Sequence, residues 1–180
     1  MFGRLRSWEE KLYYYYSLVH IPITVLIDSS VVVPEKFQLL PGLVRFHVEQ
    51  NHDYLLYEKP AVLRCFVWLE LIVQLPLFVY FAWEFRQLWS LRGQDEKLAK
   101  DGVVSDVGSQ IESRTRRLYR LLYLYGVNAA STTLWCIYMV CMHGYYPATG
   151  EPLSTPDLVN LVFVYLPTFI IPARLIFLKY

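Results

Sequence analysis

The sequence is poor in charged residues, which make up 18% of its 180 positions, and its basic and acidic side chains nearly cancel to a net charge of +1. A soluble domain ordinarily has about 25% charged residues, so the composition argues against a water-exposed surface around the whole chain. No nucleic-acid-binding motif is present, and no nucleic-acid partner is expected. The sequence also lacks a phosphate-binding glycine loop and the ligand spacing of the usual metal sites, so it predicts no cofactor and no metal.

Cysteine is scarce as well. Cys65, Cys136 and Cys141 each lie in or beside an apolar stretch. A free thiol in apolar surroundings behaves as a small hydrophobic side chain, whereas metal ligation and disulfide frameworks show characteristic spacings. We therefore interpret the three cysteines as buried hydrophobic residues.

Hydrophobic residues are abundant, at 55% of the chain, and are gathered into long blocks. Each block is long enough to cross a bilayer core of roughly 30 Å, which needs about 20 helical residues, and a helix satisfies its backbone polar groups internally. The sequence therefore predicts an all-α, polytopic membrane protein with one domain over residues 1–180, folded as a four-transmembrane-helix bundle. The expected spans are residues 12–33, 63–89, 121–142 and 158–177. Prolines within three of these spans, Pro22, Pro76, Pro167 and Pro172, predict kinked helices.

The basic residues are distributed unevenly between the expected loops. They are concentrated before the first span and in the segment 90–120, whereas the loop 143–157 contains no Lys or Arg. The positive-inside rule places both termini and the segment 90–120 in the cytosol. Because residues 92–117 are polar and mixed in charge, we expect a mobile loop with a helical start into the third span. Its arginines are interpreted as topology-setting residues that contact lipid headgroups, with a specific anionic-lipid or protein docking site as the alternative.

Two carboxylates lie within the expected spans. Asp28 lies in the first span and shares a helical face with His20 and Thr24, because steps of four residues return to nearly the same face. Glu70 lies at a similar depth in the second span, with Gln74 one turn later. Ionisable groups in hydrocarbon are costly and are a functional hypothesis by default. Together they predict an acidic intramembrane pocket near the luminal side.

Uncharged polar residues of the other spans have two interpretations. Thr132 of the third span, and Tyr165 and Thr168 of the fourth, are pocket residues in one interpretation. In the other, Thr132, together with Asn128, Ser131 and Asn160, forms hydrogen bonds between helices, worth about 0.6 kcal/mol each. His20 has the same two interpretations, as a pocket residue or as a histidine satisfied within the bundle.

Three ordered sequence blocks carry a family resemblance. They are HIPIT at 20–24 followed by Asp28, EL with QLP at 70–76, and VYLP with IP at 164–172. These blocks closely resemble the sigma-2 receptor subfamily of the EXPERA family, to which the Δ8–Δ7 sterol isomerases also belong. The resemblance covers nearly the whole chain except the second loop, which is longer in this sequence.

The resemblance implies a multi-pass protein of the endoplasmic reticulum membrane with a pocket that opens laterally to lipid. Asp28 matches the ligand-binding aspartate of the family, and Asp53, in the first luminal loop, matches a second pocket aspartate. Glu70, Gln74 and Thr132 match further pocket positions. Thr168 stands in place of a pocket tyrosine, which alters the expected shape of that wall.

Three functions follow from this resemblance. The first is non-enzymatic binding of a sterol-like lipid or a cationic amphiphile, with a role in lipid homeostasis or protein trafficking. The second is an adaptor in the endoplasmic reticulum that assists the targeting of mitochondrial precursor proteins through protein partners at the loop 90–120. The third is sterol isomerisation, which needs an acid and a base; His20 and Glu70 match isomerase positions, but Thr24 stands where a glutamate is expected. A homodimer is a further expectation.

Overall fold

The structure, a computed structural model, describes residues 5–101 and 106–178, and within them the chain is helical with no strand. The elements are α1 (Ser7–Leu26), η1 (Asp28–Val31), η2 (Glu35–Phe37), α2 (Pro41–Asn51), α3 (Tyr54–Glu58), α4 (Ala61–Leu69), η3 (Glu70–Gln74), α5 (Leu75–Lys100), α6 (Val107–His143) and α7 (Thr155–Leu175). The predicted all-α class is confirmed.

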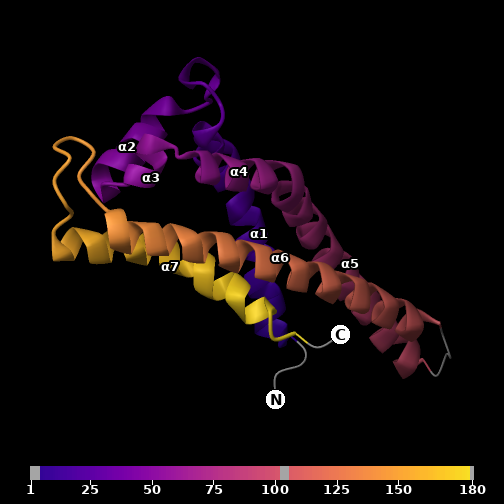
Figure 1. The fold of residues 1–180 in the computed structure, drawn as a ribbon. Coiled ribbons are helices and arrows are strands. Elements are labelled where there is room, and N and C mark those ends of the chain that lie inside the picture. Colours follow the sequence, from indigo (N-terminus) through magenta and orange to yellow (C-terminus); the bar gives the residue numbers. More distant parts are fainter. Residues whose placement is uncertain (1–4, 102–105, 179–180) are drawn as a thin grey trace.

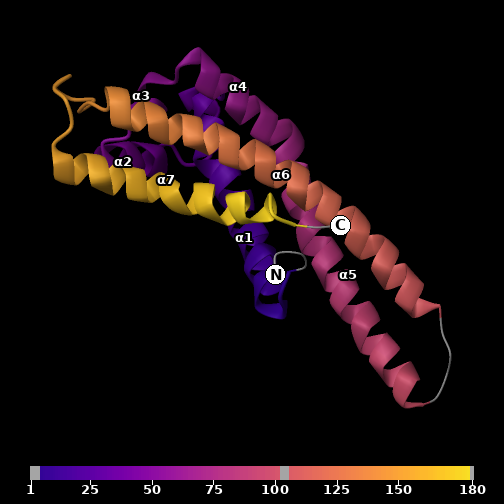
Figure 2. The ribbon, with the colours of Figure 1, turned by 60° about the horizontal axis from the view of Figure 1, so that its bottom comes forward.

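The long helices pack as neighbours in chain order. α6 and α7 lie side by side and antiparallel, α5 runs beside the first half of α6, and α1 packs across α5 (Figures 1 and 2). Gly126 permits a close approach of α6 to α7, because a Cβ atom there would lie 2.7 Å from both the Leu175 Cβ and the Pro172 carbonyl oxygen.

Within the described residues, two helical runs are long and apolar enough to cross a membrane, Ala61–Lys100 and Thr155–Leu175. They correspond to the second and fourth expected spans. The other two expected spans fall on α1 and α6, in which tyrosine, serine, threonine and asparagine are interspersed among the apolar residues.

The first helix differs from the predicted 12–33 span. α1 begins at Ser7 and ends at Leu26, so Asp28 lies just beyond it, in the short 3-10 helix η1. The Ser29 hydroxyl donates to the Val25 carbonyl oxygen at 2.7 Å and so satisfies one of the acceptors left open at the helix end. The prediction that Asp28 lies within the first helix is therefore wrong by two residues.

A π-helical turn interrupts the second predicted span. α4, η3 and α5 form one continuous run in which the Leu75 N–H donates to the Glu70 carbonyl, five residues back. Pro76 follows immediately; it has no N–H to donate, and its ring crowds the carbonyl of the preceding turn. The run changes direction between α4 and α5 (Figure 1).

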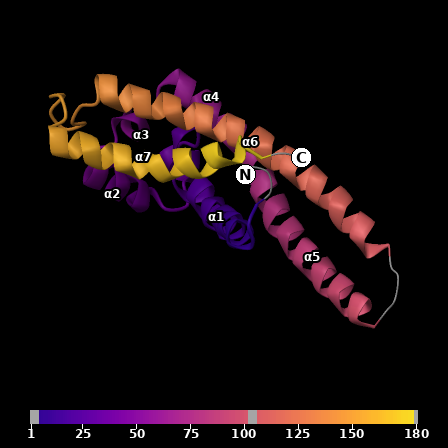
Figure 3. The same ribbon diagram turned by 90° about the horizontal axis from the view of Figure 1, so that it is seen from below.

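The predicted mobile loop at 92–117 is wrong. α5 continues to Lys100 and α6 begins at Val107, so these helices form a hairpin that projects past the ends of α1 and α7 (Figures 2 and 3). An ion pair joins the two helices of this hairpin. The Nε and Nη2 atoms of Arg114 in α6 each donate to the buried Glu84 carboxylate of α5 at 2.8 Å. Residues 102–105, within the same segment, lie outside the described part.

Two more buried glutamates hold α1 at this end of the molecule. Glu9 accepts from the Arg174 Nε of α7 at 2.9 Å, and Glu10 accepts from both terminal nitrogens of Arg92 at 2.6 and 2.9 Å. Charge-assisted, bidentate pairs of this kind fix geometry as well as charge. The sequence alone predicts no role for these two glutamates.

The segment between α1 and α4 contains two helices that were not predicted. α2 and α3 end at residues with left-handed backbone, His52 (φ 53°) and Lys59 (φ 52°). They complete one of two separate apolar clusters, which also contains Leu63, Val67 and Leu161. The other cluster lies towards the opposite end, among α1, α5 and α6.

Candidate functional site

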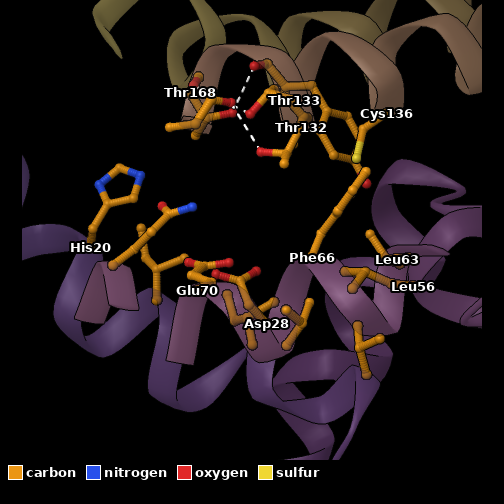
Figure 4. Close-up of a pocket in the computed structure, with 18 of the residues that line it drawn as sticks. His20, Asp28, Leu56, Leu63, Phe66, Glu70, Thr132, Thr133, Cys136 and Thr168 are labelled. Atoms are coloured by element: carbon orange, nitrogen blue, oxygen red, sulfur yellow. Dashed lines mark hydrogen bonds between the residues drawn. The ribbon is translucent and has the colours of Figure 1, made fainter. Parts of the chain in front are cut away.

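A cavity of about 410 Å³ lies between the two apolar clusters. Its apolar lining includes Ile27, Val31, Leu56, Leu63, Phe66 and Val67. Figure 4 shows His20 at one end, Leu56 and Leu63 at the other, Asp28 and Glu70 on one wall and three threonines on the facing wall. The site therefore combines an apolar interior with one acidic wall.

The acidic wall is built from η1, which follows α1 and carries Asp28, and from the π turn, which carries Glu70. The Thr24 hydroxyl donates to Glu70 Oε1 at 2.5 Å, and Thr24 is fully buried. The carboxyl groups of Asp28 and Glu70 lie beside one another, within interaction range (Figure 4). Two segments far apart in sequence thus bring two carboxyl groups together at the cavity surface.

Gln74 and Thr132 face the cavity but direct hydrogen bonds to α6. The Gln74 side-chain amide donates to Asn128 Oδ1 at 2.7 Å. The Thr132 hydroxyl lies 3.1 Å from each of two α6 carbonyl oxygens, those of Asn128 and Ala129. Gln74 therefore ties the π turn to α6.

Asp53 lines the cavity as a buried connection between three helices. Its Oδ1 accepts from the Leu56 N–H at 3.2 Å and so caps α3, and its Oδ2 accepts from the Tyr165 hydroxyl of α7 at 2.8 Å. The His47 Nε2 of α2 lies 3.5 Å from the same Oδ2. Both carboxylate oxygens are thus engaged by protein groups, which favours a supporting role for Asp53.

His20 is oriented by Tyr16, one turn earlier. Their rings stack with centroids 3.8 Å apart, and the His20 Nδ1 lies 3.1 Å from the Tyr16 carbonyl oxygen. A carbonyl only accepts, so Nδ1 carries the hydrogen and Nε2 is the acceptor of the neutral ring. Nε2 is buried and has no hydrogen-bond partner among the described residues, so it is available to a group inside the cavity.

The remaining predicted pocket residues also reach the cavity. The Thr168 hydroxyl donates to the Tyr165 carbonyl oxygen within α7 at 2.7 Å. Eight of the nine predicted site residues line the cavity, and Thr24 lies directly behind Glu70.

Other lining residues were missed by the sequence analysis. Tyr16 lies one helical turn from His20, and Cys136 one turn from Thr132, so helical spacing alone points to both. His47 lies on a helix that was not predicted, and nothing local indicates its position. Cys65 and Cys141 are exposed, so the prediction that all three cysteines are buried holds only for Cys136.

Comparisons with known proteins agree with the family resemblance. Residues 39–178 match the family model described as EXPERA (EXPanded EBP superfamily). The chain is 43% identical over 179 residues to "Efficient mitochondria targeting-associated protein 19" of Saccharomyces cerevisiae, covering 97% of this chain and 99% of that protein. It is 26% identical over 178 residues to "Sigma intracellular receptor 2" of Xenopus tropicalis (97% of this chain, 87% of that protein). The identity to the human protein of that name is 25% over 163 residues, with coverages of 87% and 78%.

Proposed function

The chain belongs to the EXPERA family, and on that premise we propose that it is a non-enzymatic, multi-pass membrane protein that binds a sterol-like lipid or a cationic amphiphile in the cavity. The observation that carries this proposal is the pairing of Asp28 and Glu70 on the wall of a largely apolar space. A carboxylate away from water needs a partner, and a ligand with an amine or a hydroxyl group supplies one.

We assign ligand contact to Asp28, as the counter-ion of a protonated amine or the acceptor of a sterol hydroxyl. Glu70 is held by Thr24 and shares a proton with Asp28, which limits the repulsion between the two groups. Gln74 and Asp53 keep the surrounding helices in place through their bonds to Asn128 and Tyr165.

The dimensions and lining of the cavity suit such a ligand. Its volume of about 410 Å³ lies within the roughly 300–1,000 Å³ of small-molecule sites, which are mostly apolar with a few polar groups. The apolar end at Leu56 and Leu63 would hold the hydrocarbon part, and the acidic wall would hold the polar group (Figure 4).

Thr24 argues against isomerase chemistry. Double-bond isomerisation needs a proton donor and a proton acceptor positioned on the substrate. His20 offers an open ring nitrogen, but the residue one turn later is a threonine whose hydroxyl is buried against Glu70. Conversion of a Δ8 sterol by the purified protein would overturn the non-enzymatic assignment.

The test of ligand binding is Asp28→Asn in the purified full chain, with a fluorescent tertiary-amine amphiphile as the probe. Losing a charge-assisted bond of about 1.5–3 kcal/mol lowers affinity by roughly ten- to a hundredfold. Glu35→Gln is the matched control, because Glu35 is an exposed carboxylate paired with Arg45, and the cavity lining does not include it. Unchanged affinity in a folded Asp28→Asn variant would contradict the proposal.

We also propose four spans with both termini cytosolic, in the endoplasmic reticulum membrane. Leu5 and Leu178 belong to one apolar cluster, so the two ends of the described chain lie at the same end of the molecule. An even number of spans places both termini on the same side of the membrane, and this arrangement supports the proposal. A glycosylation sequon inserted in the loop 144–154 should be modified in cells, and one inserted next to Asp101 should not. Modification at the site next to Asp101 and not in the loop 144–154 would show that the orientation in the membrane is the reverse of the one proposed.

A second candidate function is that of an adaptor for mitochondrial precursor proteins. It is favoured by the similarity to a protein named for mitochondrial targeting and by the projecting α5–α6 hairpin (Figure 2). Replacing residues 93–113 by a short glycine–serine linker should abolish recovery of precursor proteins in a pull-down while probe binding is retained. Full recovery of these partners would exclude the hairpin as their binding site.

A further inference from the structure

The segment leading into α2 carries a concentration of exposed apolar side chains. Phe37 and Leu39 are each 68% exposed, and Phe46 is 62% exposed. Leu40 and Leu43 are exposed as well. Large apolar side chains that are exposed together within one short segment point to an interaction site.

α2 has three distinct faces. With about 100° between successive helical residues, Val44 and Val48 form one face, which is packed into the bundle. Leu43 and Phe46 form a second face, and Arg45 and Glu49 a third, which is exposed and charged. A helix with separate apolar and charged outer faces suits a boundary between hydrocarbon and water.

The apolar face lies next to one of the candidate membrane spans. Val48 of α2 packs in the same cluster as Leu158 and Val162 near the start of α7. On those turns of α7, Val159 and Phe163 are exposed apolar residues, and the polar Asn160 is exposed between them. α2 therefore packs against a candidate membrane span, and both helices carry exposed apolar side chains at this end of the molecule.

Charged groups border this patch as they do at membrane surfaces. The Lys36 ammonium lies 4.8 Å from the centroid of the Phe37 ring, and Glu35 and Arg45 form an exposed ion pair. Long basic side chains at an interface extend towards water while their apolar neighbours remain in lipid.

We propose that the apolar patch formed by Phe37, Leu39 and Leu40 before α2 and by Leu43 and Phe46 on α2 inserts into the headgroup–acyl boundary of the bilayer. The occupant of this surface is lipid, and the proposal rests on the membrane location given under the proposed function. The inner face of the same helix carries His47, which lines the cavity and lies 3.5 Å from the Asp53 carboxylate. The bilayer thus holds in place a helix that forms part of the cavity wall.

The test places an environment-sensitive fluorophore at single cysteines of the full chain in phosphatidylcholine vesicles. Cys65 and Cys141 are first replaced by serine, and the buried Cys136 is kept. Labels are attached in Phe46→Cys, in Glu49→Cys on the charged face, and in Phe163→Cys on α7. Each is exposed to aqueous iodide and to lipids with a nitroxide on a shallow acyl carbon.

We expect the label at position 46 to lose most of its fluorescence to the nitroxide lipids and little to iodide, and the label at 49 to behave in the opposite way. Equal iodide quenching of the labels at 46 and 49 would overturn the proposal. Protection of the label at 46 from both quenchers would also overturn it, because it would mean that protein covers the patch.

The label at position 163 tests the membrane location separately. Nitroxide quenching at 163 shows that α7 is in the membrane, so failure at 46 alone leaves the proposed function standing. Failure at both positions overturns the membrane location too. If Phe46→Cys does not fold, Leu39→Cys, which precedes the helix, reports on the same surface.

Discussion

The hydroxyl of Thr24 donates to Glu70 Oε1 across 2.5 Å, joining the end of α1 to the π turn of the next long helical run. This bond fixes the direction of the Glu70 carboxyl group, so that the group lies beside Asp28 at the cavity wall (Figure 4). The geometry of the acidic wall therefore depends on a residue that does not itself line the cavity.

Thr24→Val should lower both stability and ligand affinity. Valine has a similar shape but leaves the half-buried Glu70 oxygen without this donor, at a cost of about 1–3 kcal/mol. The thermal unfolding midpoint in detergent and the affinity for the amine probe measure the two effects. Ser17→Ala is the control, because the Ser17 hydroxyl is also buried and donates to the Tyr13 carbonyl of its own helix, and the cavity lining does not include it. An equal loss in both variants would count against a special role for Thr24.

Arg114→Met should destabilise the α5–α6 hairpin by about 3–5 kcal/mol, because it leaves the buried Glu84 carboxylate without its partner. Arg116→Met removes an exposed pair with Glu112 on the same helix, for which we expect less than about 1 kcal/mol. Denaturant unfolding of the two variants measures the difference. Similar stabilities would show that the Glu84 pair contributes little.

Gly126→Ala should force α6 and α7 apart. The added Cβ would lie 2.7 Å from the Pro172 carbonyl oxygen, a backbone atom that cannot move independently of the helix, and overpacking costs about 1–3 kcal/mol. Gly93→Ala is the control, since beyond its own stretch of helix no described atom lies within 4 Å of the position of its Cβ, and alanine there should stabilise α5 by up to about 1 kcal/mol. The unfolding midpoints should therefore move in opposite directions.

Asp53→Ala and Asp28→Asn should separate a supporting carboxylate from a ligand-binding one. Asp53→Ala removes the cap of α3, worth about 0.5–2 kcal/mol, together with the Tyr165 bond, so stability and binding should fall together. Asp28→Asn should reduce binding and leave the unfolding midpoint unchanged. A stable Asp53→Ala variant that fails to bind the probe would make Asp53 a direct ligand contact.

Sequence reasoning located the candidate site better than it located the helix boundaries. Asp28 and Glu70 were conspicuous because carboxylates are rare in long apolar stretches, and the cavity brings them together. The end of α1 before Asp28 depends on a local bond from Ser29, which hydrophobicity does not reveal.

The hairpin at 92–117 shows why amino-acid composition could not distinguish helices from a loop in this segment. A polar segment of mixed charge has the same composition whether it is a solvated loop or a pair of helices joined by ion pairs. The deciding contact, between Glu84 and Arg114, joins residues 30 positions apart, and no local pattern predicts such a pair. α2 was missed for a related reason, because its charged residues interrupt the apolar ones.

The π turn determines the direction in which each half of its helical run faces. In an uninterrupted α-helix Leu63, Val67, Phe78 and Phe81 would lie along a single stripe, since their spacing matches about 3.6 residues per turn. The extra residue in the wide turn rotates one half relative to the other by about 100°, so the first two side chains enter one apolar cluster and the last two enter the other. Removing one residue between Glu70 and Gln74 would put the two halves back in phase and turn one of these pairs away from its cluster. The number of residues in this turn is therefore as much a constraint on the protein as their chemical nature.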